Sequence, residues 1–151
     1  MKSYQNVLCA TDFSGYCRAA AERAADMARR FGAQLTLLHV VEHFPVNRSN
    51  EIIAPEDVDP KDYREQRARE SLTELAQRLE YDTVAQEVRF STQAVKHEIV
   101  RFAEEQNTDL IVVATHGRHG ITPILGSTAY GVSHTAPCDV LIVRAHCEVG
   151  A

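Results

Sequence analysis

The stretch DLIVVATHGRHGITPILGST, residues 109–128, decides the fold of this chain. Its residues 110–114 are apolar at every position, which is typical of a central parallel strand covered by helices on both faces. Gly117 and Gly120 follow, and residues without a Cβ let the backbone approach a ligand or take positive φ. Gly126, Ser127 and Thr128 then predict a hydroxyl cap and ligand-facing N–H groups at the start of a helix. This order predicts a phosphate site; the alternative is a tight connection without a ligand.

Length and composition predict one globular domain. The chain has 151 residues, of which 44% are hydrophobic and 25% charged, with a net charge of −5. We expect a domain over residues 1–147 and a short tail over 148–151. The chain has no basic stripe, so nucleic acid is not an expected partner. No apolar run approaches the roughly 18 residues of a membrane helix, and the N-terminus predicts no signal peptide.

The cysteines indicate a reducing compartment. Cys9, Cys17, Cys138 and Cys147 include no C-x-x-C pair, so neither a zinc site nor dithiol redox chemistry is expected. Cys9 lies in an apolar strand pattern and is predicted to be a core residue. Free thiols fit a cytoplasmic protein.

Strand and helix patterns alternate along the whole chain. The pattern predicts strands over 6–11, 35–41, 83–90, 109–115 and 140–144, helices over 16–30, 61–79, 94–106 and 127–136, and a long loop over 42–60. This alternation predicts an α/β three-layer sandwich with a parallel sheet and right-handed crossovers. Ligands of such sheets bind at the carboxyl ends of the strands, where the strand order reverses. The loops after Thr11 and Thr115 form one crevice if strands one and four are neighbours, which periodicity leaves open.

Asp12 and two histidines are the polar candidates beside this crevice. The Asp12 carboxylate suits a ribose or a phosphate-bound metal, and the alternative is a cap of the first helix. His116 and His119 have metal-like spacing, but no cysteine or carboxylate stands near them in sequence, which favours a polar rim. Ser127 lacks the G-x-S-x-G context of an activated nucleophile.

Taken together, five segments resemble the universal stress protein family. They are VLCATDFS, LTLLHVVE, DLIVVATHGRHG, LGST and CDVLIVR, in this order along the chain. The resemblance implies a five-stranded parallel sheet of order 3-2-1-4-5 with helices on both faces. It also implies a cytoplasmic homodimer joined through the last strand, from Val140 to Val143, which would otherwise be an exposed apolar edge.

The resemblance further implies a nucleotide site and a choice between two subgroups. ATP-binding members carry G-x-x-G, nine residues, then G-[ST]. Here Ala114 replaces the first glycine, and eight residues separate Gly117 from Gly126. Pro123 also stiffens the loop. The positions implied to bind the ligand are Asp12 for ribose, the Val40 backbone for adenine, and, for phosphates, Thr115, His116, Gly117, Gly126, Ser127 and Thr128.

Three functions remain open from the sequence. The first is a binding and signalling module for an adenine nucleotide, with ATP and its Mg²⁺ as the implied ligands. The second, favoured by Ala114 and the shortened loop, is a dimeric interaction protein of the same family that binds no ATP. The third is a slow ATPase with Asp12 facing a metal and Arg118 as the nearby cation, an inference from fold analogy. We expect a non-catalytic role.

Overall fold

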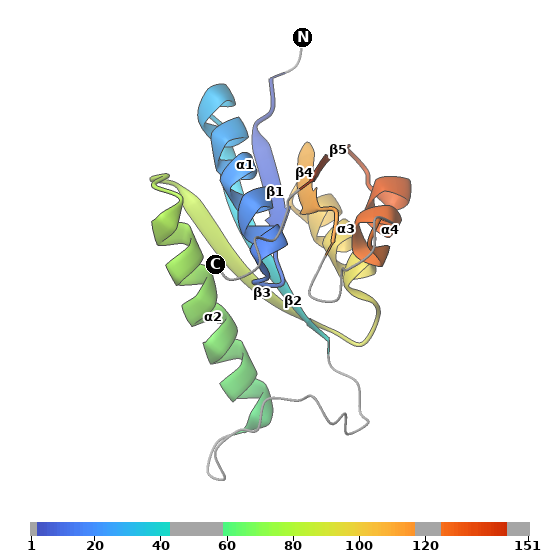
Figure 1. Ribbon diagram of the computed structural model, residues 1–151. Helices are drawn as coiled ribbons and strands as arrows, with labels where there is room; N and C mark the ends of the chain where they lie inside the picture. The colour runs from blue at the N-terminus through green and yellow to red at the C-terminus, as the bar shows by residue number, and fades with distance from the viewer. Residues whose placement is uncertain (1–2, 43–58, 117–124, 145–151) are drawn as a thin grey trace.

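Strands and helices alternate through residues 3–42, 59–116 and 125–144, which are the residues that the computed structural model describes (Figure 1). The elements are β1 (Asn6–Ala10), α1 (Gly15–Phe31), β2 (Gln34–Glu42), α2 (Pro60–Arg78), β3 (Val84–Ser91), α3 (Val95–Glu105), β4 (Leu110–Ala114), α4 (Ser127–Thr135) and β5 (Asp139–Val143). Each predicted element is confirmed, with its ends displaced by at most one residue. Glu42 belongs to β2, Pro60 begins α2 and Asp59 caps that helix; residues 43–58, Cys147 and the predicted tail lie outside the described residues.

The five strands form one parallel sheet of order β3-β2-β1-β4-β5. This confirms the predicted fold class and makes β1 and β4 neighbours. Connections from β1 run outward through β2 to β3, and the chain then returns to the other side of β1 to place β4 and β5. The strand order therefore reverses between β1 and β4, which is where sheets of this type bind ligands.

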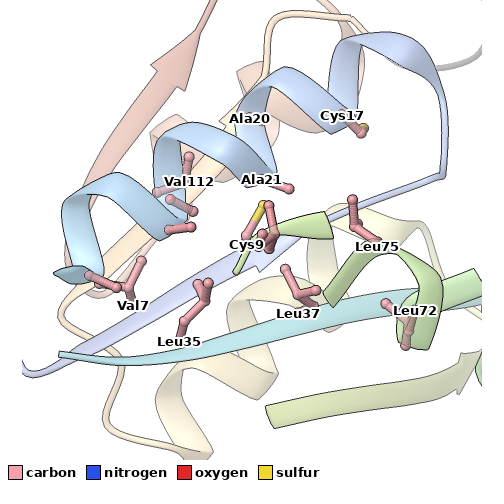
Figure 2. Close-up of a cluster of buried hydrophobic side chains, with 14 of the residues drawn as sticks. Val7, Cys9, Cys17, Ala20, Ala21, Leu35, Leu37, Leu72, Leu75 and Val112 are labelled. Carbon is pink, nitrogen blue, oxygen red and sulfur yellow. The ribbon is translucent and has the colours of Figure 1, made fainter. Parts of the chain in front are cut away.

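Two cores cover the faces of the sheet, because successive strand residues point to opposite sides. On one face Cys9, Leu37 and Val112 pack beneath α1 and α2 (Figure 2). On the other face Leu8, Leu38 and Ile111 pack beneath α3 and α4. Figure 1 shows these helix pairs on opposite sides of the sheet. The central strand β1 is apolar and buried from Val7 to Ala10 because both of its faces are covered.

Helix α1 lies close to the sheet through alanines. Its buried residues are Cys17, Ala20, Ala21, Ala24, Ala25 and Ala28. Ala19 and Met27 lie beside this stripe and are half-buried. Ser14 caps the first turn by accepting a hydrogen bond from the Cys17 N–H, and Gly32 ends the helix with φ 64°. Both ends follow the expected residue preferences.

The outer strands differ in how they are covered. β3 pairs with β2 at one edge and mixes polar and apolar residues, as its alternating pattern predicts. β5 pairs with β4 at the other edge, and its residues Val140 to Val143 are half-buried. Within the described residues, no helix has the length and apolar character to span a membrane.

Candidate functional site

The predicted crevice is the region where β1, β2 and β4 end, beside the reversal of strand order. The last paired residues of β1 and β2 are Ala10 and Leu38. Strand β2 continues to Glu42, and over this extension it pairs, among the described strands, only with β3, as far as Ser91. Residues 39–42 therefore extend past β1, and their backbone on the β1 side faces the crevice. In a strand, N–H and C=O groups on an unpaired side are available to a ligand. Val40 lies in this overhang, with its side chain buried in the core under α3 and its backbone at the edge.

The turn from β1 into α1 is held by its own side chains. The Thr11 hydroxyl accepts the Phe13 N–H at 3.0 Å, and the Asp12 Oδ1 accepts the Ser14 N–H at 2.9 Å. Phe13 has φ 67°, in the left-handed region that bulky residues rarely adopt. These side-chain hydrogen bonds satisfy backbone N–H groups that have no strand or helix partner within the turn. The turn leaves Asp12 half-buried at the carboxyl end of β1.

Asp12 fulfils part of the capping alternative. Its Oδ1 atom orders the turn before α1, whereas Ser14 provides the N-cap itself. A carboxylate has two oxygens and about four acceptor positions, so it can accept several hydrogen bonds at once. A position at the reversal of strand order suits hydrogen bonds to ribose hydroxyls. The geometry is compatible with both the capping role and the ribose role that the sequence left open.

A direct hydrogen bond closes the β4–α4 connection. The Gly126 N–H donates to the Thr115 carbonyl at 2.7 Å, and the Thr115 N–H donates to the Val143 carbonyl at 3.1 Å. A Cβ on Gly126 would lie 3.0 Å from that same Thr115 oxygen. Gly126 is therefore required by close backbone approach. Thr115 is only 6% exposed. Its carbonyl positions the start of α4 by accepting the Gly126 N–H group.

The predicted hydroxyl cap of α4 is wrong. Gly126 is the N-cap residue, and within the described part of the chain this helix has no side-chain cap hydrogen bond. Ser127 is exposed and Thr128 half-buried on the first turn. First-turn N–H groups have no acceptor within a helix and carry the positive end of its dipole. The α4 terminus can therefore offer backbone N–H groups, rather than a hydroxyl cap, to an anion; the predicted phosphate site stays a prediction.

Ala114 lies in the core and not on the surface of the crevice. It is 8% exposed and belongs to the hydrophobic cluster on the α1 side of the sheet. Gly117, Gly120, Arg118, His119 and Pro123 lie outside the described residues.

Two pairs of an aromatic ring and a histidine ring stand on either side of Asp12. Phe13 and His39 have ring centroids 4.5 Å apart, on the β2 side. Tyr16 and His116 have centroids 5.7 Å apart, on the β4 side. The His116 Nδ1 atom is also 3.1 Å from the Thr115 hydroxyl. The sequence reasoning predicted His116 but missed the other three residues; a histidine inside the apolar run LTLLHVV was the available signal.

The cysteines near the crevice are poor nucleophiles. Burial, and after it the nearby Asp12 charge, together raise the pKa of the Cys17 thiol to about 11. Burial also raises the pKa of Cys9, which the structure places in the core as expected. Both thiols are neutral at pH 7 and hidden from substrates. Within residues 3–42, 59–116 and 125–144, no group of three potential metal ligands occurs.

Comparison with known proteins agrees with this architecture. The model of the universal stress protein family matches residues 3–144. The chain belongs to the universal stress protein family. Universal stress protein A homolog 1 of Coxiella burnetii is 39% identical over 140 residues, covering 93% of this chain and 96% of that protein. The sequence resemblance is thereby confirmed.

Solved structures of universal stress proteins share the fold. Universal stress protein UspA from Lactobacillus plantarum is 26% identical, with a TM-score of 0.67 over 95% of this chain and 100% of that one. A universal stress protein in complex with cAMP is 25% identical, with a TM-score of 0.67 over 94% of this chain and 98% of that one. This universal stress protein therefore has a relative of similar structure that binds an adenine nucleotide.

Proposed function

We propose that this universal stress protein is a non-catalytic module that binds an adenine nucleotide in the crevice between β1 and β4. The observation that carries the proposal is the β2 overhang beside Asp12 at the reversal of strand order. The overhang offers backbone groups to a base, Asp12 offers a carboxylate to ribose, and the α4 terminus offers N–H groups to phosphate. These are the three kinds of contact that a nucleotide requires.

The relative bound to cAMP supports the choice of ligand class. Both cAMP and ATP contain adenine, ribose and phosphate, so the proposal covers the shared chemistry. ATP with Mg²⁺ is the more specific version. It depends on residues 117–124 for much of its phosphate binding, and the connection there is one residue shorter than the ATP-binding pattern.

Calorimetry on protein stripped of nucleotide tests the proposal. AMP, cAMP and ATP are titrated separately, with and without Mg²⁺. We expect saturable binding of at least one adenine nucleotide, weakened at least tenfold by Gly126→Val. The added side chain would crowd the Thr115 carbonyl that positions the α4 terminus. If none of the three nucleotides binds at millimolar concentration, the proposed function is wrong.

The second candidate is a dimeric interaction protein that binds no ATP. Its support is β5, an edge strand with four half-buried apolar residues in the described sheet. We propose that Val140 to Val143 pair with the same strand of a second copy, since an isologous contact would cover both edges. Light scattering after size exclusion measures the mass; Leu141→Lys should shift a dimer toward the monomer. A monomeric wild-type protein would contradict this proposal.

A further inference from the structure

We propose that Phe13, supported by His39, forms an aromatic wall that holds the face of the nucleotide base. This wall rests on the proposed nucleotide site and deepens it by naming the group that contacts the base. Neither residue belongs to the positions that the sequence resemblance implied. The two side chains come from different strand ends and meet at the crevice with ring centroids 4.5 Å apart.

The backbone of Phe13 fixes where its ring lies. A left-handed residue that is not glycine costs about 1 kcal/mol or more, and such residues persist only where the surrounding structure over-determines them. Here the Thr11 hydroxyl holds the Phe13 N–H, and Asp12 holds the next N–H along the chain. The turn thus directs the ring toward the β2 side, where it packs partly against the core under α1 and α2.

His39 supports the ring from the neighbouring strand. Its Nδ1 atom lies 2.8 Å from the Thr11 carbonyl oxygen. Because a carbonyl oxygen only accepts hydrogen bonds, Nδ1 carries the proton. This bond ties the imidazole to the end of β1, and the ring planes of His39 and Phe13 are inclined by 35°. The pair is therefore anchored on both strands.

The aromatic wall lies between the proposed ribose contact and the proposed base contact. Phe13 follows Asp12, the proposed ribose contact, and His39 precedes Val40, the proposed base contact. Both residues are half-buried, so neither is fully covered by the core. The Val40 backbone can read the edge of a base while the aromatic ring supports its face. Stacking is tolerant of base identity because every base has a π-face, so the edge contact supplies the selectivity.

The test compares AMP with ribose 5-phosphate, which has the same sugar and phosphate but no base. Calorimetry measures both ligands with wild-type protein, with Phe13→Leu and with Phe31→Leu. Leucine keeps apolar volume at position 13 without a flat ring. Phe31 is a matched control because it is 41% exposed at the other end of α1, beside Tyr4.

We expect Phe13→Leu to weaken AMP about tenfold, as base–aromatic stacking predicts. Ribose 5-phosphate should bind equally to all three proteins. In proton NMR spectra, the adenine H2 and H8 signals should move upfield on binding to wild-type protein and much less with Phe13→Leu. A merely structural Phe13 would weaken both ligands together and leave these shifts unchanged.

The outcomes separate the wall from the site. If wild-type protein binds AMP and Phe13→Leu binds it equally well, the wall is wrong and the nucleotide site stands. If both ligands weaken together, Phe13 supports the turn and the wall is again overturned. If wild-type protein binds no AMP, cAMP or ATP, the proposed function itself fails.

Discussion

The two ends of the sheet are built in different ways. At the amino ends of the strands, side chains join segments that are far apart in sequence. Asp109 accepts the N–H groups of Gln5 at 2.7 Å and Asn6 at 3.0 Å, and the Tyr4 hydroxyl donates to Asp139 at 2.7 Å. At the carboxyl ends, the Thr11 hydroxyl and the Asp12 Oδ1 atom each accept an N–H group of the same turn. Side-chain carboxylates thus join distant strands at the amino ends and shape a local turn at the carboxyl ends.

This difference indicates that residues at the amino ends of the strands stabilise the fold, whereas residues at the carboxyl ends bind the ligand. Long-range bonds at the amino end oppose unfolding of the sheet, because breaking them releases whole strands. Local bonds at the carboxyl end order the crevice but join few distant elements. We therefore expect substitutions at the amino end to lower stability and leave ligand affinity unchanged, and substitutions at the carboxyl end to do the reverse. The four predictions below test this separation.

The largest expected effect comes from Asp109→Ala. Removing a carboxylate that accepts two backbone N–H groups should lower the free energy of unfolding by about 2 kcal/mol. Asp109→Asn, which keeps one acceptor oxygen, should lose about half as much. Urea denaturation with an unchanged m-value measures both. A parallel loss of AMP affinity would show that the two ends are coupled.

Asp12→Asn should act on binding instead. Asparagine retains an oxygen for the Ser14 N–H, so the free energy of unfolding should change by less than about 0.5 kcal/mol. Loss of the charge should weaken AMP about tenfold, since hydrogen bonds to charged groups are the stronger ones. Calorimetry and thermal unfolding of the same preparation compare the two quantities. Unchanged affinity would remove Asp12 from the ligand site.

The Cys17 thiol reports on the carboxyl end through pH. Its pKa rises from 9.0 to about 11 on folding, chiefly by burial. The folded state therefore binds more protons above pH 9, and stability present below that pH is lost as pH rises toward 11. Between pH 8 and 9.5, wild-type protein should lose about 0.8 kcal/mol more than Cys17→Ala. Parallel pH profiles for the two proteins would mean that the turn leaves this thiol open to water.

The smallest expected effect is that of Tyr4→Phe. The variant removes the hydroxyl that donates to Asp139 but keeps the ring against Phe31. Because this bond is near the surface, its loss should cost about 0.5 kcal/mol. The bond to Asp139 is also the main reason that the pKa of Tyr4 is raised. Absorbance titration should therefore show a lower tyrosine pKa in Asp139→Asn; no change would contradict the bond.

Hydrophobic periodicity was sufficient to predict the strands and helices. The apolar run of β4 is buried at every position, whereas β3 mixes exposed and buried residues and lies at an edge of the sheet. Ser14 and Gly32 marked the ends of α1 by their backbone preferences. Strand order required the family resemblance, because periodicity shows which face is buried and not which strands are neighbours.

The site was predicted less completely for a physical reason. Asp12 and Gly126 are recognisable because few residue types fill their roles. The pairing of Phe13 with His39 depends on a turn and a strand overhang that no local pattern encodes. The error at the α4 terminus has a similar origin: two hydroxyl residues favoured a side-chain cap, but the contact between Gly126 and Thr115 determines the start of that helix.

The overhang of β2 has a consequence for how recognition changes during evolution. A base that bonds to the Val40 backbone reads groups that every residue type except proline presents in full. Replacing the side chain at position 40 would alter the core and leave those donors and acceptors in place. Recognition of this kind depends on the backbone path of β2 and not on its side chains. Relatives can then diverge widely in sequence while the preference for a base persists, and they lose it when the length of β2 changes.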